Sequence, residues 1–102
     1  MQTQDKITLQ EFCMHQHIEI SFVEALQERG LIELDHVDAT PAVSINQLPE
    51  LEKMARFYYE MEINLEGIET IAHLLRRIDE MQQEMIRLNN RLDFYEPGDN
   101  DL

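Results

Sequence analysis

The chain has few of the residues on which several classes of protein depend. Among its 102 residues are one cysteine, three prolines and three isolated glycines. Cys13 alone cannot form an internal disulfide, and nothing therefore indicates an oxidising compartment. Isolated glycines also make no phosphate-cradling loop. No apolar run approaches the roughly 18 residues that indicate a membrane span, and the first residues have no apolar stretch of signal-peptide length. These absences predict a cytoplasmic protein.

Basic residues are scarce. Eight Lys and Arg stand against 21 Asp and Glu, which gives a formal net charge of −13. Such a field repels phosphate backbones, because nucleic-acid affinity comes largely from Lys and Arg that displace counterions. It attracts basic protein surfaces. The composition favours a protein partner over nucleic acid or a membrane, although acidity alone can also serve only solubility.

No set of residues indicates catalysis or metal binding. Cys13, His15 and His17 lie close in sequence, but on a helix Cys13 and His17 share a face while His15 points elsewhere. Neighbouring carboxylates such as Asp79 and Glu80 splay apart on a helix. We therefore expect no enzymatic activity, no metal ion and no cofactor.

A short helix is predicted over residues 9–17. Thr8 is an N-cap candidate, and Glu11 stands at the third position after it, as in a capping box. The helix would bury Leu9, Phe12 and either Cys13 or His17.

A second helix is predicted over residues 22–29. Ser21 is its expected cap, with Glu24 three residues on, and Gly30 is its expected left-handed end. Two short helices with a short link make a helix-turn-helix candidate.

A small wing and a third helix are expected next. Residues 31–34 and 42–45 are read as two short strands joined by a polar turn. Asn46 is a candidate cap for a helix over residues 47–61, with Pro49 in its first turn. Asn64 and Gly67 mark a break before the last helix.

The last helix carries a heptad pattern. Its a and d positions are all apolar or aromatic: Ile71, Leu74, Ile78, Met81, Met85, Leu88, Leu92 and Tyr95. A repeat sustained over more than three heptads predicts a coiled coil, and we expect these residues to form the seam of a homodimer. Packing of the seam against the third helix of the same chain is the alternative.

The layout resembles the MerR family over most of the chain. The matching motifs are Thr8-Leu9-x-Glu11, Arg29-Gly30-Leu31-Ile32 and the break at residues 64–68. Glu11-Phe12-Cys13-x-His15, with Leu88-x-x-Arg91-Leu92 near the end, is similar to a narrower family, the CbpM-type chaperone modulators. That resemblance implies binding to the J-domain of a DnaJ/CbpA-type co-chaperone and inhibition of its action with DnaK. One motif departs: residues 65–67 read Leu-Glu-Gly where CbpM-type proteins usually have Trp-Pro-Gly.

The sequence also departs from DNA-binding MerR regulators, which carry an arginine followed by tyrosines in the second helix. Here those positions fall at about Glu24, Ala25 and Leu26, and the second strand of the wing has no arginine. A glutamate beside a phosphate is repulsive. A MerR-type transcription regulator is therefore the alternative function, and a helper with an unrelated partner is a third.

These observations predict a mainly α chain: a MerR-like winged helix-turn-helix, then a helix and a long C-terminal coiled-coil helix. The expected divisions are residues 1–62, 63–96 and a disordered acidic tail, 97–102. The expected partner-binding residues belong to two acid-rich clusters: Glu24, Gln27, Glu28, Glu60, Glu62, Glu66 and Glu69.

Overall fold

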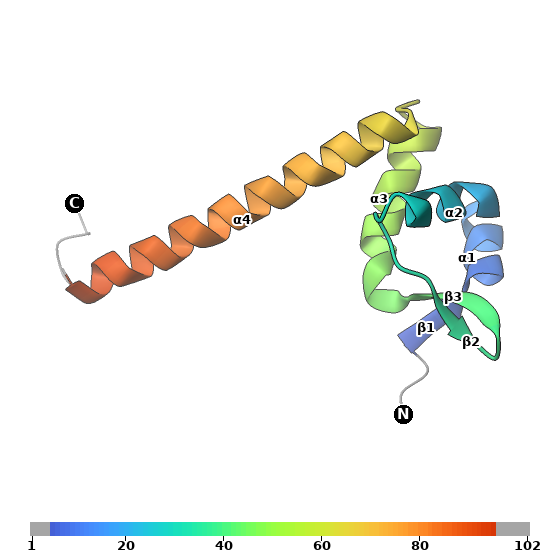
Figure 1. Cartoon of the computed structure of the whole chain (residues 1–102), viewed down its shortest axis with the longest axis horizontal. Coiled ribbons are helices and arrows are strands. Elements are labelled where there is room, and N and C mark those ends of the chain that lie inside the picture. Colours follow the sequence, from blue (N-terminus) through green and yellow to red (C-terminus); the bar gives the residue numbers. More distant parts are fainter. Residues whose placement is uncertain (1–4, 96–102) are drawn as a thin grey trace. The chain divides into compact units, whose positions relative to one another are not determined.

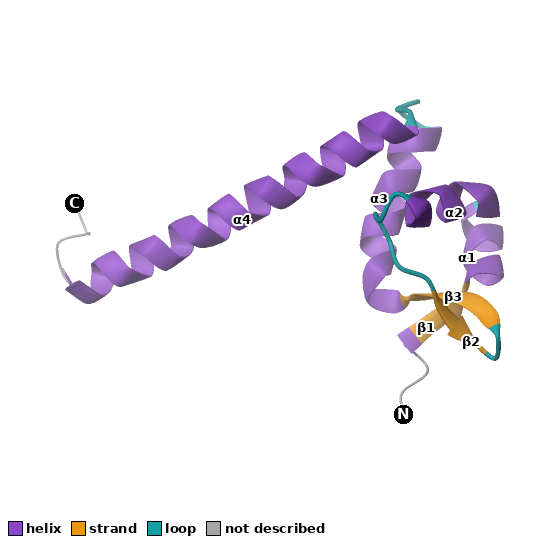
Figure 2. Cartoon of the chain, in the orientation of Figure 1, coloured by secondary structure: helices purple, strands orange, loops and turns teal. Residues whose placement is uncertain are grey.

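The computed structural model describes residues 5–95, which form four α-helices, one 3-10 helix and three strands (Figures 1 and 2). In chain order they are β1 (Lys6–Thr8), α1 (Leu9–Gln16), α2 (Ile20–Glu28), β2 (Asp35–Val37), β3 (Thr40–Ser44), η2 (Ile45–Gln47), α3 (Leu48–Tyr59) and α4 (Leu65–Tyr95). The chain divides into two compact units, Met1–Glu69 and Thr70–Leu102. The predicted tail, residues 97–102, lies outside the described residues.

Helix α1 begins as the sequence predicts. Thr8 is its N-cap, and the Thr8 hydroxyl accepts a hydrogen bond from the backbone N–H of Glu11 at 3.1 Å. The helix ends at Gln16, one residue earlier than predicted, and its C-cap is His17, whose φ of 59° is left-handed. The backbone N–H of Ile18 then donates to the Cys13 carbonyl, which satisfies an orphan acceptor of the helix end. Of the two candidates for the buried position, Cys13 is buried and His17 is exposed.

Helix α2 begins two residues before the predicted start and ends at Glu28, one residue before the predicted end, while Gly30 is left-handed as predicted. Gly30 has a φ of 76°, its N–H donates to the Gln27 carbonyl, and the N–H of Leu31 donates to the Leu26 carbonyl. This is the Schellman pattern that a left-handed glycine permits. The prediction of Ser21 as N-cap was wrong. The cap is Glu19, whose extended backbone starts the helix at Ile20, and the Ser21 hydroxyl donates to the Glu19 carboxylate instead.

The small sheet has the order β1-β3-β2 and is antiparallel throughout. Strand β1 was not predicted, and the prediction of a first wing strand at residues 31–34 was wrong. In that segment Ile32 is buried in the core. The backbone of Glu33 pairs with the side-chain amide of Gln47 and not with a neighbouring strand: the amide accepts from the Glu33 N–H at 3.0 Å and donates to the Glu33 carbonyl at 2.8 Å. The hairpin follows at residues 35–44, with Asp38 and Ala39 both at positive φ, as a two-residue turn requires.

Helix α3 is shorter than predicted and is not capped by Asn46. The 3-10 turn η2 precedes it, and the Asn46 side chain accepts from the Ser44 hydroxyl at 2.6 Å, which leaves it no role at the helix start. Pro49 lies in the first turn of α3, as predicted. The buried side chains of α3 are those of Leu51, Met54 and Ala55.

One core joins the elements of Met1–Glu69. Its fully buried members are Leu26, Leu51, Ile68, Val23 and Val43. They come from α2, β3, α3 and α4, with two of them from α2, and each such burial contributes about 1.5–3 kcal/mol. Ile68 belongs to the first turn of α4, so this end of α4 is fixed to the helix-turn-helix unit.

Helix α4 begins at Leu65, inside the predicted break at residues 64–68. The Asn64 side chain accepts from the Gly67 N–H at 2.8 Å, which is the bond of an N-cap. Gly67 therefore lies inside the first turn rather than in a break. The mainly α winged helix-turn-helix with a further helix and a long C-terminal helix is confirmed.

Candidate functional site: the acidic faces of the helix-turn-helix unit

Charge is distributed very unevenly between the two units. Residues 5–69 carry fourteen Asp and Glu against four Lys and Arg, a formal charge of −10. Residues 70–102 carry seven acidic and four basic side chains, a formal charge of −3, and within them residues 70–95 are formally neutral. The strong negative field therefore belongs to the helix-turn-helix unit, and any electrostatic attraction of a partner acts on that unit.

The first predicted cluster lies on one face of α2. Glu24, Gln27 and Glu28 are all exposed, one helical turn apart, and line a hollow of about 310 Å³. Its other wall comes from the wing and the segment before it: Leu34, His36 and Pro41. The structure thus brings all three predicted residues together, beside the hairpin.

The second predicted cluster is divided by the structure. Glu66 and Glu69, one turn apart at the start of α4, both form ion pairs with Arg29: the distances are 3.5 Å from Nη2 to Glu66 Oε2 and 2.9 Å from Nη1 to Glu69 Oε1. Glu60 and Glu62 stand in the segment between α3 and α4 and are exposed, and Glu62 has a φ of 58°. The four glutamates therefore do not form one uniform surface.

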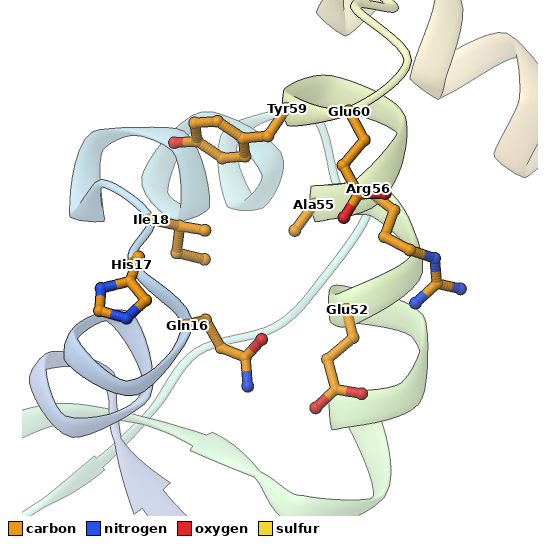
Figure 3. Close-up of a pocket in the computed structure, with 8 residues that line it drawn as sticks. All are labelled: Gln16, His17, Ile18, Glu52, Ala55, Arg56, Tyr59 and Glu60. Atoms are coloured by element: carbon orange, nitrogen blue, oxygen red, sulfur yellow. The ribbon is translucent and has the colours of Figure 1, made fainter.

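A second hollow, which the sequence analysis did not predict, lies between the end of α1 and one side of α3 (Figure 3). It measures about 390 Å³, and we call it the α1–α3 groove. Its lining is Gln16, His17 and Ile18 on one side and Glu52, Ala55, Arg56, Tyr59 and Glu60 on the other. Only Glu60 among these was a predicted partner-binding residue.

Aromatic rings lie beside the α1–α3 groove. Phe22 is buried and stacks on Tyr58 at a centroid distance of 4.6 Å, and Tyr59 packs edge-on to both rings. The Tyr59 hydroxyl accepts a hydrogen bond from the Glu19 N–H at 3.1 Å, which holds the ring in place. Tyr58 and Tyr59 are nevertheless 37% and 40% exposed. The sequence signal for this feature was two adjacent tyrosines at the end of an amphipathic helix.

No cation stands at about residues 24–26 or 42–45, the positions at which DNA-binding MerR regulators were expected to carry one. Glu24 is exposed on α2, and Arg29, at the end of the helix, is engaged by Glu66 and Glu69. In β3, Ala42 and Val43 are buried, so the strand turns no basic side chain outward there. The negative charge on the exposed face of α2 is electrostatically unfavourable beside a phosphate.

Cys13 is buried, and its burial raises the pKa of the thiol above the ordinary 9.0, which keeps it protonated and unreactive near neutrality. Within residues 5–95, no three His, Cys, Asp or Glu side chains are placed to hold a metal ion. No helix in that same part of the chain has the length and apolar character needed to cross a membrane.

The predicted seam of α4 presents a continuous apolar strip. Ile71 is half-buried, and the seven seam residues from Leu74 to Tyr95 are 47–70% exposed in the single chain. A strip of this length at heptad spacing is typical of a helix that pairs with another.

Comparison with known proteins agrees with this architecture. No curated protein and no solved structure gives a significant match. The family model for the MerR HTH family regulatory protein matches residues 7–90, which spans every described element from the first strand to most of α4. The chain therefore belongs to the MerR helix-turn-helix family of regulatory proteins.

Proposed function

We propose that this protein is a chaperone modulator: it binds the J-domain of a DnaJ/CbpA-type co-chaperone and inhibits its action with DnaK. The observation that carries the proposal is the formal charge of −10 on residues 5–69, with Glu24 and Glu28 exposed on the helix that a MerR regulator would place in DNA. The resemblance of the N-terminal and C-terminal motifs to CbpM-type modulators supplies the identity of the partner.

Electrostatics argue for a protein partner over operator DNA. Direct readout in the major groove depends on Arg, Lys, Asn or Gln at base edges, and affinity depends on cations at phosphates. On α2 only Gln27 is of that kind among the exposed residues of the acidic face, and it is flanked by Glu24 and Glu28. A basic protein surface meets the same face with complementary charge.

The long helix suits a homodimer. Residues 70–95 are formally neutral, so two copies can pair along the seam without net repulsion. Pairing would bury the apolar strip and leave two acidic helix-turn-helix units, each able to hold one J-domain. The dimer is part of the proposal.

Inhibition would follow from competition. J-domains of this kind present a basic face to DnaK, as the resemblance to the modulators implies. An acidic protein that covers this face removes the J-domain from DnaK without touching the nucleotide site of DnaK. No catalytic step by this chain is involved.

The test is the ATPase activity of DnaK stimulated by the J-domain co-chaperone. We expect added protein to lower the stimulated rate towards the basal rate and to leave the basal rate unchanged. The inhibition should weaken as salt rises, because exposed charges are screened over about 10 Å at 0.1 M. Stimulation that persists with the protein in excess at low salt would leave a binding protein with an unrelated partner.

A further inference from the structure

The α1–α3 groove combines features that single it out from the rest of the acidic surface. It is a hollow of about 390 Å³ with an apolar floor, Ile18 and buried Ala55, and an aromatic wall, Tyr59. The Tyr59 ring is fixed by the Glu19 N–H and by packing on Phe22. Exposed aromatic residues held in one position are typical of the anchor points of protein interfaces.

The charged groups of the groove are arranged along one side of α3 and its C-cap. Glu52, Arg56 and Glu60 follow at intervals of four residues, so all three stand on one face. Figure 3 shows the Arg56 guanidinium turned to the outer side of α3, away from Gln16 and His17, while the Glu60 side chain runs back towards Ala55. No ion pair joins Arg56 to either glutamate, whereas Lys6, Arg29 and Lys53, the other basic residues within the described range 5–69, are all paired.

We propose that the α1–α3 groove binds an arginine side chain of a basic protein partner. The guanidinium of this arginine would lie between the Glu52 and Glu60 carboxylates. The alkyl part of the same side chain would lie on Ile18 and the Tyr59 ring. A guanidinium fits this set better than an ammonium, because its planar fork can donate to two carboxylates at once while the alkyl chain of the arginine packs on the ring. The Gln16 carbonyl is a further acceptor on the opposite wall.

The assignment rests on the proposed function only in its choice of a basic partner. It names a docking point on the α3 side of the unit, distinct from the α2 face that the sequence predicts. Arg56 of the same chain would compete with the partner's arginine. If its side chain turned inward, its guanidinium would occupy the position between the Glu52 and Glu60 carboxylates. Its removal should therefore strengthen the binding of an external cation.

The experiment uses the full-length protein and a capped arginine, acetyl-arginine methylamide, in a titration followed by amide chemical shifts. We expect shifts confined to residues 16–18 and 52–60, with a dissociation constant in the millimolar range, as one side chain in an open groove would give. Capped citrulline, the uncharged isostere, should cause no comparable shifts. Shifts elsewhere only, or equal shifts with citrulline, would overturn the proposal.

Variants locate the charge. Glu52→Gln with Glu60→Gln should weaken arginine binding at least about tenfold, since two charge-assisted hydrogen bonds are lost. Glu11→Gln with Glu33→Gln makes the same change of charge on exposed sites away from the groove and should leave binding within about twofold, as expected of screened, distant charges. Arg56→Gln should tighten it, and weaker binding by Arg56→Gln would indicate an anion site and contradict the proposal. Circular dichroism checks that each variant keeps its helix content.

Titration with the purified J-domain separates the two proposals. If the J-domain binds the unmodified protein and the Glu52→Gln, Glu60→Gln variant equally well, the groove assignment fails while the proposed function stands. If the J-domain does not bind but arginine occupies the groove, the proposed function fails and the assignment stands for another basic partner.

Discussion

Arg29 Nη1 lies 2.9 Å from Glu69 Oε1, and this ion pair joins the end of α2 to the start of α4 across forty residues of sequence. Glu66 approaches the same guanidinium at 3.5 Å. Two of the seven predicted partner-binding residues are thus engaged within their own unit. They hold the start of α4 beside the helix-turn-helix, where buried Ile68 already fixes it.

The Arg29–Glu69 pair should make a small, salt-sensitive contribution to stability. A double-mutant cycle of Arg29→Met and Glu69→Gln is expected to give a coupling of about 0.5 kcal/mol, because both side chains are partly exposed and exposed pairs are worth about 0.2–1 kcal/mol. Urea unfolding at low salt measures it. In about 1 M salt the coupling should vanish. A coupling above about 2 kcal/mol would show that the pair is effectively desolvated.

The stability cost of replacing Gly30 should come from its backbone conformation and not from a steric clash of the new side chain. Its φ is 76°, and a Cβ built there would meet no atom within 4 Å. Gly30→Ala should therefore cost about 1 kcal/mol from the left-handed conformation alone, and Gly30→Asn should cost less, since asparagine tolerates that region. Chemical unfolding of the two variants compares them. Equal losses, or no loss with alanine, would contradict the strain explanation.

The sequence predicted features that are local. The Thr8 cap, the Gly30 end and the long helix each depend on residues within a few positions. Two local predictions, the caps at Ser21 and Asn46, were wrong because each side chain bonds a neighbour two residues away. The other failures involve a distant partner. Strand β1 is three residues long and exists because Lys6–Thr8 pairs with β3 nearly forty residues later, and Gln47 holds residue 33 in a non-strand conformation. Such pairings leave no periodic signal.

The candidate site divides in the same way. The cluster Glu24, Gln27 and Glu28 was predictable because helical spacing alone places it on one face. The α1–α3 groove was not, because it needs the left-handed turn at His17 and the packing of Phe22 against the end of α3. The pairing of Arg29 with Glu66 and Glu69 also depends on tertiary structure.

A charge in the α4 seam should abolish the proposed dimer. Leu88→Glu would place an unpaired charge in the seam at a cost of several kcal/mol, and the protein should become monomeric. Ile86→Glu is the matched control: Ile86 is 60% exposed and stands outside the a and d positions, so the dimer should persist. Light scattering at tens of micromolar distinguishes the states. A monomer before any substitution would refute the dimer.

Operator DNA should not be retained by this protein. A gel shift at low salt, where electrostatic attraction is strongest, is the demanding condition. We expect no sequence-specific complex at sub-micromolar protein with DNA from upstream of its own gene. The variant Glu24→Arg with Glu28→Arg should gain non-specific affinity, because it replaces the repulsive charges of α2 with phosphate-binding ones. A specific complex formed by the unmodified protein would favour the transcription-regulator alternative.

The most direct test of the account is calorimetry of the protein with the purified J-domain, at tens of micromolar of each and at low salt. The account predicts measurable heat, an affinity that falls as salt rises, and weaker binding by Glu24→Lys with Glu28→Lys or by Glu60→Lys with Glu62→Lys, with helix content intact. One of these two double variants is expected to bind as tightly as the unmodified protein if its face does not contact the J-domain. No heat and no co-elution with the J-domain under these conditions would contradict the central claim that the acidic helix-turn-helix unit binds a J-domain.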